Sequence, residues 1–162
     1  MIDPIHLLNY VIRPVLKDLH LWSAEAERLV LGTACQESQC GRWLRQVGTG
    51  PALGIYQMEP VTYRDLWVNF LQHRAQLAAA VLAWSTCVPP DVPPSSELIG
   101  NLNYATAMCR VHYLRVPAKI PASLPEQAEY WKRFYNSELG AGTAREYVSS
   151  WRRFVPADLV YV

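Results

Sequence analysis

No apolar run in this sequence approaches the roughly 18 residues that a membrane-spanning helix needs. The N-terminus also lacks the basic start and the unbroken apolar stretch of a secretory signal peptide. Four charged residues interrupt it: Asp3, Arg13, Lys17 and Asp18. The net charge is only +1 at pH 7, so the chain as a whole is not attracted to nucleic acid or to an anionic membrane. We therefore expect a chain made in the cytoplasm, with no membrane span and no nucleic-acid partner.

Cysteine and histidine do not occur at the spacings of a metal site. The cysteines are Cys35, Cys40, Cys87 and Cys109. Neither His73 nor His112 adds a ligand at the required spacing. We predict no metal and no other cofactor, and we expect the cysteines to be buried free thiols. A disulfide between Cys35 and Cys40 is the alternative, although it would strain the end of a helix.

Strand patterns are weak, whereas apolar residues recur at helical spacing along most of the chain. The predicted helices cover residues 4–22, 24–38, 62–85, 98–116, 123–137 and 143–154. Suitable N-cap residues begin three of them: Ser23, Ser123 and Thr143. Gly41 is suited to end the second helix, residues 46–54 predict an irregular loop or a small β segment, and the prolines of 87–96 predict an exposed connector. With 162 residues, about half of them apolar, we predict one mainly α domain.

A single carboxylate, Glu37, stands near the end of the second predicted helix, and no Asp or Glu follows it before Glu59. On a helix it shares a face with three residues: Val30, Thr33 and Ala34. An apolar surrounding raises the pKa of a carboxyl group because it disfavours the charged form. Such a glutamate is suited to act as the general acid that cleaves a glycosidic bond. The alternative is a helix-end glutamate that faces solvent.

Most glycosidases use two carboxylates, one on each side of the bond that is cleaved. The sequence offers no clear second carboxylate, since Glu59 and Asp65 are the nearest acids after Glu37. One acid is enough if the substrate supplies the nucleophile. The acid then protonates the leaving oxygen, and its carboxylate takes a proton from a hydroxyl of the substrate.

Several segments, in order, resemble the lytic transglycosylase pattern. They are "ESQCGRW" at 37–43, "ALGIYQMEPVTY" at 52–63, "NLNYATAMCRVHYLRV" at 101–116, "FYNSELGAG" at 134–142 and "TAREYVSSWRRF" at 143–154. The first two are similar to the family's Glu-Ser and to its Gly-Leu-Met-Gln-x-x-Pro-x-Thr motif. The last two resemble its Ala-Tyr-Asn-Ala-Gly motif and its closing Thr-Arg-x-Tyr-Val helix. The ordered set, and not any single segment, carries the resemblance.

The resemblance implies a lysozyme-like fold that cleaves the MurNAc–GlcNAc bond of peptidoglycan, whose glycan strands would be the partner. It implies one domain over 1–162, with a transglycosylase-like core at 23–155 and an N-terminal helical extension at 1–22. A lone wall-cleaving domain without a signal peptide is similar to phage particle enzymes and secretion accessories. We therefore expect action on the cell wall after carriage in a virion or a larger assembly, on which the extension would dock. The alternative is that the extension packs across the domain.

The same resemblance makes Glu37 the acid and then the base, with the sugar's own C6 hydroxyl as the attacking group and a 1,6-anhydro product. The substrate-binding positions that it implies are Ser38, Tyr56, Gln57, Glu59, Tyr135, Asn136 and Tyr147. Tyr135 would orient Glu37 or the substrate, and Asn136 would touch the glycan or hold its loop. Three of these positions have ordinary alternatives. Ser38 would bond the helix end, Gln57 would be an exposed amide, and Tyr135 would be core.

The sequence departs from the family where Cys40 and Gly41 replace a common Phe, where Thr143 replaces a common Glu, and in a longer gap before Gln57. Glu59 also replaces a residue that is usually apolar. If Glu59 or Asp65 faced the cleft, it would activate water, and the protein would be a lysozyme-type hydrolase. A further alternative is a non-catalytic glycan-binding or structural virion module.

Overall fold

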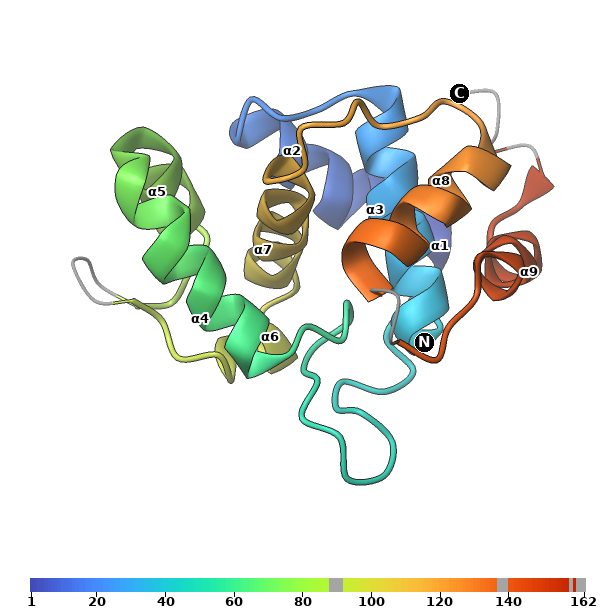
Figure 1. Cartoon of the computed structure of the whole chain (residues 1–162), viewed down its shortest axis with the longest axis horizontal. Coiled ribbons are helices and arrows are strands. Elements are labelled where there is room, and N and C mark those ends of the chain that lie inside the picture. Colours follow the sequence, from blue (N-terminus) through green and yellow to red (C-terminus); the bar gives the residue numbers. More distant parts are fainter. Residues whose placement is uncertain (88–91, 137–139, 158, 160–162) are drawn as a thin grey trace.

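The structure, a computed structural model, describes residues 1–87, 92–136, 140–157 and 159. It is mainly helical, which confirms the predicted mainly α class. In chain order the elements are α1 (Pro4–Leu7), η1 (Leu8–Ile12), α2 (Arg13–Asp18), α3 (Ala24–Ser38), α4 (Pro60–Asn69), η2 (Leu71–His73), α5 (Ala75–Leu82), α6 (Glu97–Gly100), α7 (Leu102–Leu114), α8 (Leu124–Trp131), η3 (Lys132–Asn136) and α9 (Ala144–Phe154). Figure 1 shows α3 between the α4–α5 pair on one side and α9 on the other. Within the described residues, no helix combines the length and the apolar character needed to cross a bilayer.

The central helix is α3, and ten of its 15 residues are buried. Ser23 is its N-cap as predicted, and the Ser23 Oγ accepts a hydrogen bond from the Ala26 N–H at 3.1 Å. The helix ends at Ser38 and not at Gly41, because Gln39 adopts a left-handed backbone with φ of 51°. Gly41, with φ of 79°, completes the change of direction. The chain therefore turns sharply just after Glu37 and enters the loop that leads to α4.

The N-terminal segment packs into the same core as α3. Six of its apolar side chains are at most 5% exposed: Leu7, Leu8, Ile12, Val15, Leu16 and Leu19. The π-helical turn η1 precedes Pro14 and lets the helix continue past a residue that has no backbone N–H to donate. Arg13 also forms a bidentate ion pair with Glu27 of α3, with both N–O distances at 2.8 Å. Residues 1–22 are thus built into the domain, which agrees with the alternative that they pack across it.

The predicted helix over 62–85 is divided into α4, η2 and α5. The break comes at Phe70, whose φ of −131° is not helical, and it lets Leu71 become fully buried. Local propensity favoured a continuous helix here, and burial in the tertiary fold overrode it. In the connector predicted at 87–96, residues 88–91 lie outside the described residues.

Side-chain caps fix the start of the later helices. The predicted helix over 98–116 is divided at Asn101, whose side chain caps α7 by accepting a hydrogen bond from the Tyr104 N–H at 3.0 Å. Ser123 and Thr143 cap α8 and α9 as predicted, and Thr143 forms a full capping box. The caps determine where α7, α8 and α9 begin, and all three helices contact α3.

The segment between α3 and α4 is the predicted irregular or small β region. Among the described residues it forms two isolated antiparallel bridges, which pair Leu53 with Arg45 and with Met58. Gly54 allows a close approach here, since a Cβ at this position would lie 2.1 Å from the carbonyl oxygen of Leu98. Figure 1 shows this segment as a long loop that extends beyond the helices at one edge of the molecule.

Candidate active site

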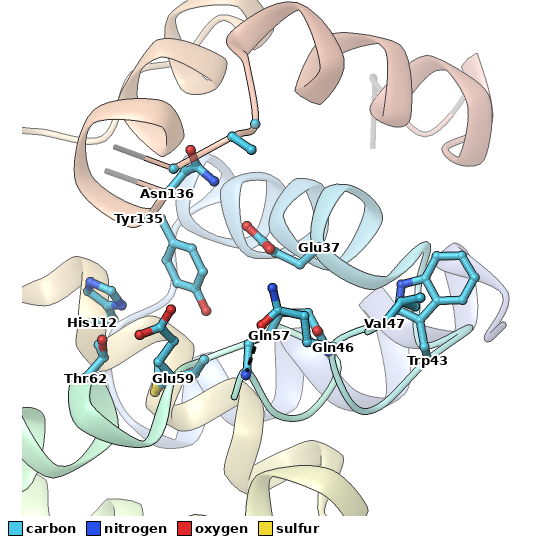
Figure 2. A pocket seen from close by; sticks show the side chains of 15 residues that line it. Glu37, Trp43, Gln46, Val47, Gln57, Glu59, Thr62, His112, Tyr135 and Asn136 are labelled. Atoms are coloured by element: carbon cyan, nitrogen blue, oxygen red, sulfur yellow. Dashed lines mark hydrogen bonds between the residues drawn. The ribbon is translucent and has the colours of Figure 1, made fainter. Parts of the chain in front are cut away.

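A cavity of about 580 Å³ lies where the end of α3 meets the loop before α4. Its described lining residues are Glu37, Trp43, Gln46, Val47, Ala52, Gln57, Met58, Glu59, Thr62, His112, Tyr135, Asn136, Gly140, Ala141 and Gly142. The volume lies within the range of small-molecule sites in proteins. Figure 2 shows Glu37 on the α3 side, with Gln57 and Glu59 across from it on the side of the loop. Carboxyl, amide, imidazole and aromatic groups from distant parts of the chain therefore face one space.

Glu37 contributes a half-buried carboxyl group to this cavity. Burial raises the pKa of Glu37 from an ordinary 4.5 to about 7, because the dry surroundings disfavour the charged form. The indole N–H of Trp131 donates a hydrogen bond to Glu37 Oε1 at 3.0 Å, which opposes the rise in the pKa. The prediction of a raised pKa is thus supported by the geometry. A glutamate in this state exchanges protons near neutral pH.

Ser38 does not line the cavity, which corrects its prediction as a substrate-binding residue. Its side chain is fully buried, and its Oγ donates a hydrogen bond to the Ile55 carbonyl at 2.6 Å. The same oxygen accepts a hydrogen bond from the Gly41 N–H at 2.8 Å. Ser38 therefore ties the loop to the end of α3, as its ordinary alternative proposed.

Gln57 lines the cavity, whereas Tyr56 does not. Gln57 has a left-handed backbone with φ of 47°, and its Nε2 donates to the Gly54 carbonyl at 2.7 Å. This bond fixes the orientation of the amide group. The amide oxygen and the second N–H do not take part in it. Tyr56 is 1% exposed, and its hydroxyl bonds Thr106 Oγ1 at 2.8 Å. The prediction that Tyr56 touches substrate is therefore wrong, because its side chain points into the core.

Tyr135 reaches the cavity from η3, a π-helical turn that follows α8. Its hydroxyl donates to the Tyr56 carbonyl at 2.8 Å, and its ring lies 4.7 Å from the His112 ring. Burial raises the pKa of Tyr135 well above its ordinary value. Because the hydroxyl proton is donated to the Tyr56 carbonyl, the oxygen of Tyr135 acts as an acceptor toward the cavity, and the Cys109 thiol is a further neighbour of this hydroxyl. Short π-helical turns often occur at functional sites, and this one aims Tyr135 into the cavity.

Asn136 both lines the cavity and holds the chain that follows it. Lys132 Nζ donates to Asn136 Oδ1 at 2.9 Å and to the Gly140 carbonyl at 2.7 Å. Both expected roles, facing the site and bracing the loop, are therefore compatible with its position. Residues 137–139, which belong to the same motif, lie outside the described residues.

Among the described residues, the second carboxylate at the cavity is Glu59, an exposed side chain just before α4. Figure 2 shows Glu59 beside Thr62 and the ring of His112. Asp65 faces elsewhere and does not line the cavity: it forms an ion pair with Arg115 and accepts a hydrogen bond from Asn69 at 2.6 Å. Of the two acids considered for activating water, only Glu59 faces Glu37 across this cavity.

Tyr147 was predicted to bind substrate, and the structure corrects this as well. It is fully buried on α9, and its hydroxyl donates to the Leu29 carbonyl of α3 at 3.2 Å. Its ring lies 5.4 Å from the ring of Trp131. The contact depends on Gly32, where a Cβ would lie 2.0 Å from the Tyr147 hydroxyl. Tyr147 therefore acts behind the site, where it joins α3 to α9 and supports Trp131.

Sequence reasoning missed Trp131 and His112. Trp131 is 1% exposed and lies four residues before Tyr135, a spacing that places both on one helical face and was the available signal. Burial, followed by the charge of Arg115, lowers the pKa of His112 to about 4. His112 is thus neutral at ordinary pH, and within the described residues its Nδ1 has no hydrogen-bond partner. His112 stands alone in the sequence, which therefore gave no indication that it lines the cavity.

The cysteine pair lies beside the site but is not bonded. The sulfur atoms of Cys35 and Cys40 are 3.3 Å apart, both residues are buried, and both are free thiols. The hydrogen bond with Cys40, followed by burial, raises the pKa of the Cys35 thiol. Across the described ranges, His, Cys, Asp and Glu side chains do not gather into a group of three or more that could hold a metal ion.

The chain matches no protein-family model, no curated protein and no solved structure. The site itself combines a half-buried acid with a pKa near neutrality, a cavity large enough for a sugar, and polar groups that are held by hydrogen bonds within the protein.

Proposed function

We propose that this protein is a peptidoglycan lytic transglycosylase with a lysozyme-like fold, which cleaves the MurNAc–GlcNAc β-1,4 bond with Glu37. The observation that carries the proposal is a glutamate with a pKa of about 7 in a cavity of about 580 Å³. Near neutral pH such a group is present in both protonation states, so one side chain serves as acid and then as base. The ordered resemblance to the transglycosylase motifs supplies the substrate class.

The reaction balances without water. Protonated Glu37 gives its proton to the glycosidic oxygen, the bond from that oxygen to C1 of MurNAc breaks, and the leaving GlcNAc departs with a hydroxyl. Positive charge develops at C1 as in other glycosidases. The Glu37 carboxylate then takes the proton from the C6 hydroxyl of the same MurNAc, and the C6 oxygen forms a bond to C1. The product is a 1,6-anhydro sugar, and Glu37 is protonated again.

The other cavity residues have the chemistry to bind and orient a glycan. Gln57 offers an amide oxygen and an N–H that are held in place by its bond to Gly54. Tyr135 offers a fixed acceptor oxygen, since its proton is used on Tyr56. Trp43 provides an aromatic surface at the edge of the cavity. A sugar held by such preset groups reaches a reactive orientation with little further loss of entropy.

A second candidate is hydrolysis, and Glu59 is the observation that favours it. Its carboxyl faces the same cavity and is accessible to solvent. In that case Glu59 would take a proton from a water molecule, the water oxygen would bond C1, and the product would have a reducing end. In the transglycosylase reaction Glu59 has no proton to move and serves only to bind the glycan or to stabilise positive charge.

Digestion of purified peptidoglycan tests the proposal. We expect the wild type and Glu129→Gln to release soluble fragments at similar rates and Glu37→Gln to release essentially none. Glu129 is a matched control because it is an exposed glutamate on α8 and does not line the cavity. Reducing-end products from the wild type, together with loss of activity in Glu59→Gln, would select hydrolysis. Binding to peptidoglycan without release of fragments by the wild type would select the non-catalytic module.

The resemblance also suggests how the protein reaches the wall. A phage particle or a secretion assembly is the carrier that the resemblance suggests, and we include this carriage in the proposal. The apolar face of the N-terminal segment is already covered by α3 and α7. Docking on a carrier would therefore use the outer face of that segment, where Tyr10 is 72% exposed.

A further inference from the structure

Trp131 is the one described side chain with a hydrogen bond to the Glu37 carboxyl group. It comes from α8, 94 residues further along the chain, and its Nε1 lies 3.0 Å from Glu37 Oε1. An indole N–H only donates and has no acceptor atom. Glu37 Oε1 must therefore be the accepting oxygen in this pair, whether the carboxyl group is protonated or charged.

We propose that Trp131 is a positioning residue for the reaction, whose indole N–H holds Glu37 Oε1 so that Oε2 is the oxygen that gives and takes the proton. This inference rests on the proposed function and assigns a role to each oxygen of the acid. A carboxyl group that rotates freely would present either oxygen to the glycosidic bond. With Oε1 occupied, the proton resides on Oε2.

The indole is held rigidly enough to act in this way. Trp131 is 1% exposed, and its ring packs against that of Tyr147 at 5.4 Å. Gly142 leaves room on another side, since a Cβ there would lie 2.6 Å from Trp131 Cη2. Tyr147 in turn donates to the Leu29 carbonyl on α3. These contacts connect α3 to Tyr147 on α9, Tyr147 to Trp131 on α8, and Trp131 to Glu37, which also lies on α3.

The same bond becomes stronger as the reaction proceeds. When Oε2 releases its proton to the glycosidic oxygen, negative charge develops on the carboxylate and the hydrogen bond becomes charge-assisted. A donor that is already in place when charge develops stabilises the transition state more than the ground state. A hydrogen bond to a charged group corresponds to about a 10- to 100-fold effect on an equilibrium or a rate. We expect a loss of this size in kcat when the N–H is removed.

Trp131→Phe removes the N–H and keeps an aromatic ring. The Trp131 bond lowers the pKa of Glu37, so its removal is expected to raise that pKa. Because the acid must be protonated, activity that falls above about pH 7 in the wild type should persist to higher pH in the variant, at a reduced maximum. If Trp131→Phe only loosened the packing around the site, water would enter and the pKa of Glu37 would fall instead of rising. Trp67→Phe is the matched control, because its buried indole bonds Tyr104 at 3.1 Å, away from Glu37.

Nuclear magnetic resonance of the wild type tests the bond even if Trp131→Phe does not fold. The Trp131 indole N–H resonance, assigned through its contact with the Tyr147 ring, should shift with pH around a midpoint near 7 and should be flat in Glu37→Gln. A resonance that does not titrate in the wild type would overturn the proposal. So would an unchanged or lowered Glu37 pKa in a folded Trp131→Phe. Absence of wall cleavage by the wild type would instead overturn the proposed function, and the indole titration would still decide whether Trp131 holds the Glu37 carboxyl group.

Discussion

The raised pKa of Glu37 makes the stability of the protein depend on pH in a specific way. In the unfolded chain Glu37 has an ordinary pKa near 4.5, and in the folded protein its pKa is about 7. A pKa that is raised on folding means that the folded state favours the neutral form. The stability that this provides is fully present below about pH 4.5 and is lost as the pH rises through 7.

The size of the effect follows from the two pKa values. The difference between 4.5 and about 7 corresponds to up to about 3 kcal/mol, at about 1.4 kcal/mol for each pKa unit. Glu37→Gln removes the titration and keeps an oxygen that accepts from Trp131. We therefore expect the free energy of unfolding of Glu37→Gln, taken relative to that of the wild type, to increase by up to about 3 kcal/mol between pH 4.5 and pH 8.

Urea unfolding followed by circular dichroism, at pH values from 4 to 8, measures this difference. Other titrating groups cancel because only the gap between the two proteins is compared. Glu129→Gln should keep a constant gap, since it changes an exposed carboxyl outside the cavity. A difference in the free energy of unfolding between Glu37→Gln and the wild type that does not change with pH, or that shifts toward the wild type as the pH rises, would refute the assignment of Glu37 as an acid with a pKa raised by burial.

Two further substitutions test the packing that supports the site. Gly32→Ala should destabilise the protein by about 1–3 kcal/mol, because overpacking against the Tyr147 hydroxyl at 2.0 Å outweighs the gain of about 1 kcal/mol in helix propensity. Gly100→Ala is the control, with open space around its Cβ, and thermal unfolding that ranks the two equally would contradict the α3–α9 contact. Glu27→Gln should cost about 2 kcal/mol in urea unfolding, less than for a fully buried pair because the Arg13 side chain is 27% exposed. An unchanged midpoint would show that the pair with Arg13 contributes nothing to stability.

Features set by neighbouring residues were predictable from the sequence. Ser23, Ser123 and Thr143 cap their helices because a cap depends on the two or three residues that follow it. The mainly α class and the irregular segment after α3 follow from periodicity and from glycine. The break at Phe70 was not predictable, because burial of Leu71 in the core decides it.

The candidate site divides along the same line. Glu37 was predicted from its helix face, from its isolation among the acids and, above all, from the resemblance of the segments around it to the transglycosylase motifs. Tyr56 and Tyr147 were assigned to substrate from motif positions, and both turn inward because their hydroxyls find partners in the core. Trp131 and His112 reach the site from segments far from Glu37 in the sequence, and only the packing of α7 and α8 against α3 brings them there.

The most direct measurement of the central claim is the nature of the product ends formed by the wild type in water enriched in heavy oxygen. Mass spectrometry of the released fragments should show 1,6-anhydro ends that carry none of the label, because the attacking oxygen comes from the sugar. Reducing ends that carry the label would show that water attacks and would move the assignment to a hydrolase. No released fragments at all, from folded protein, would contradict Glu37 as a catalytic acid.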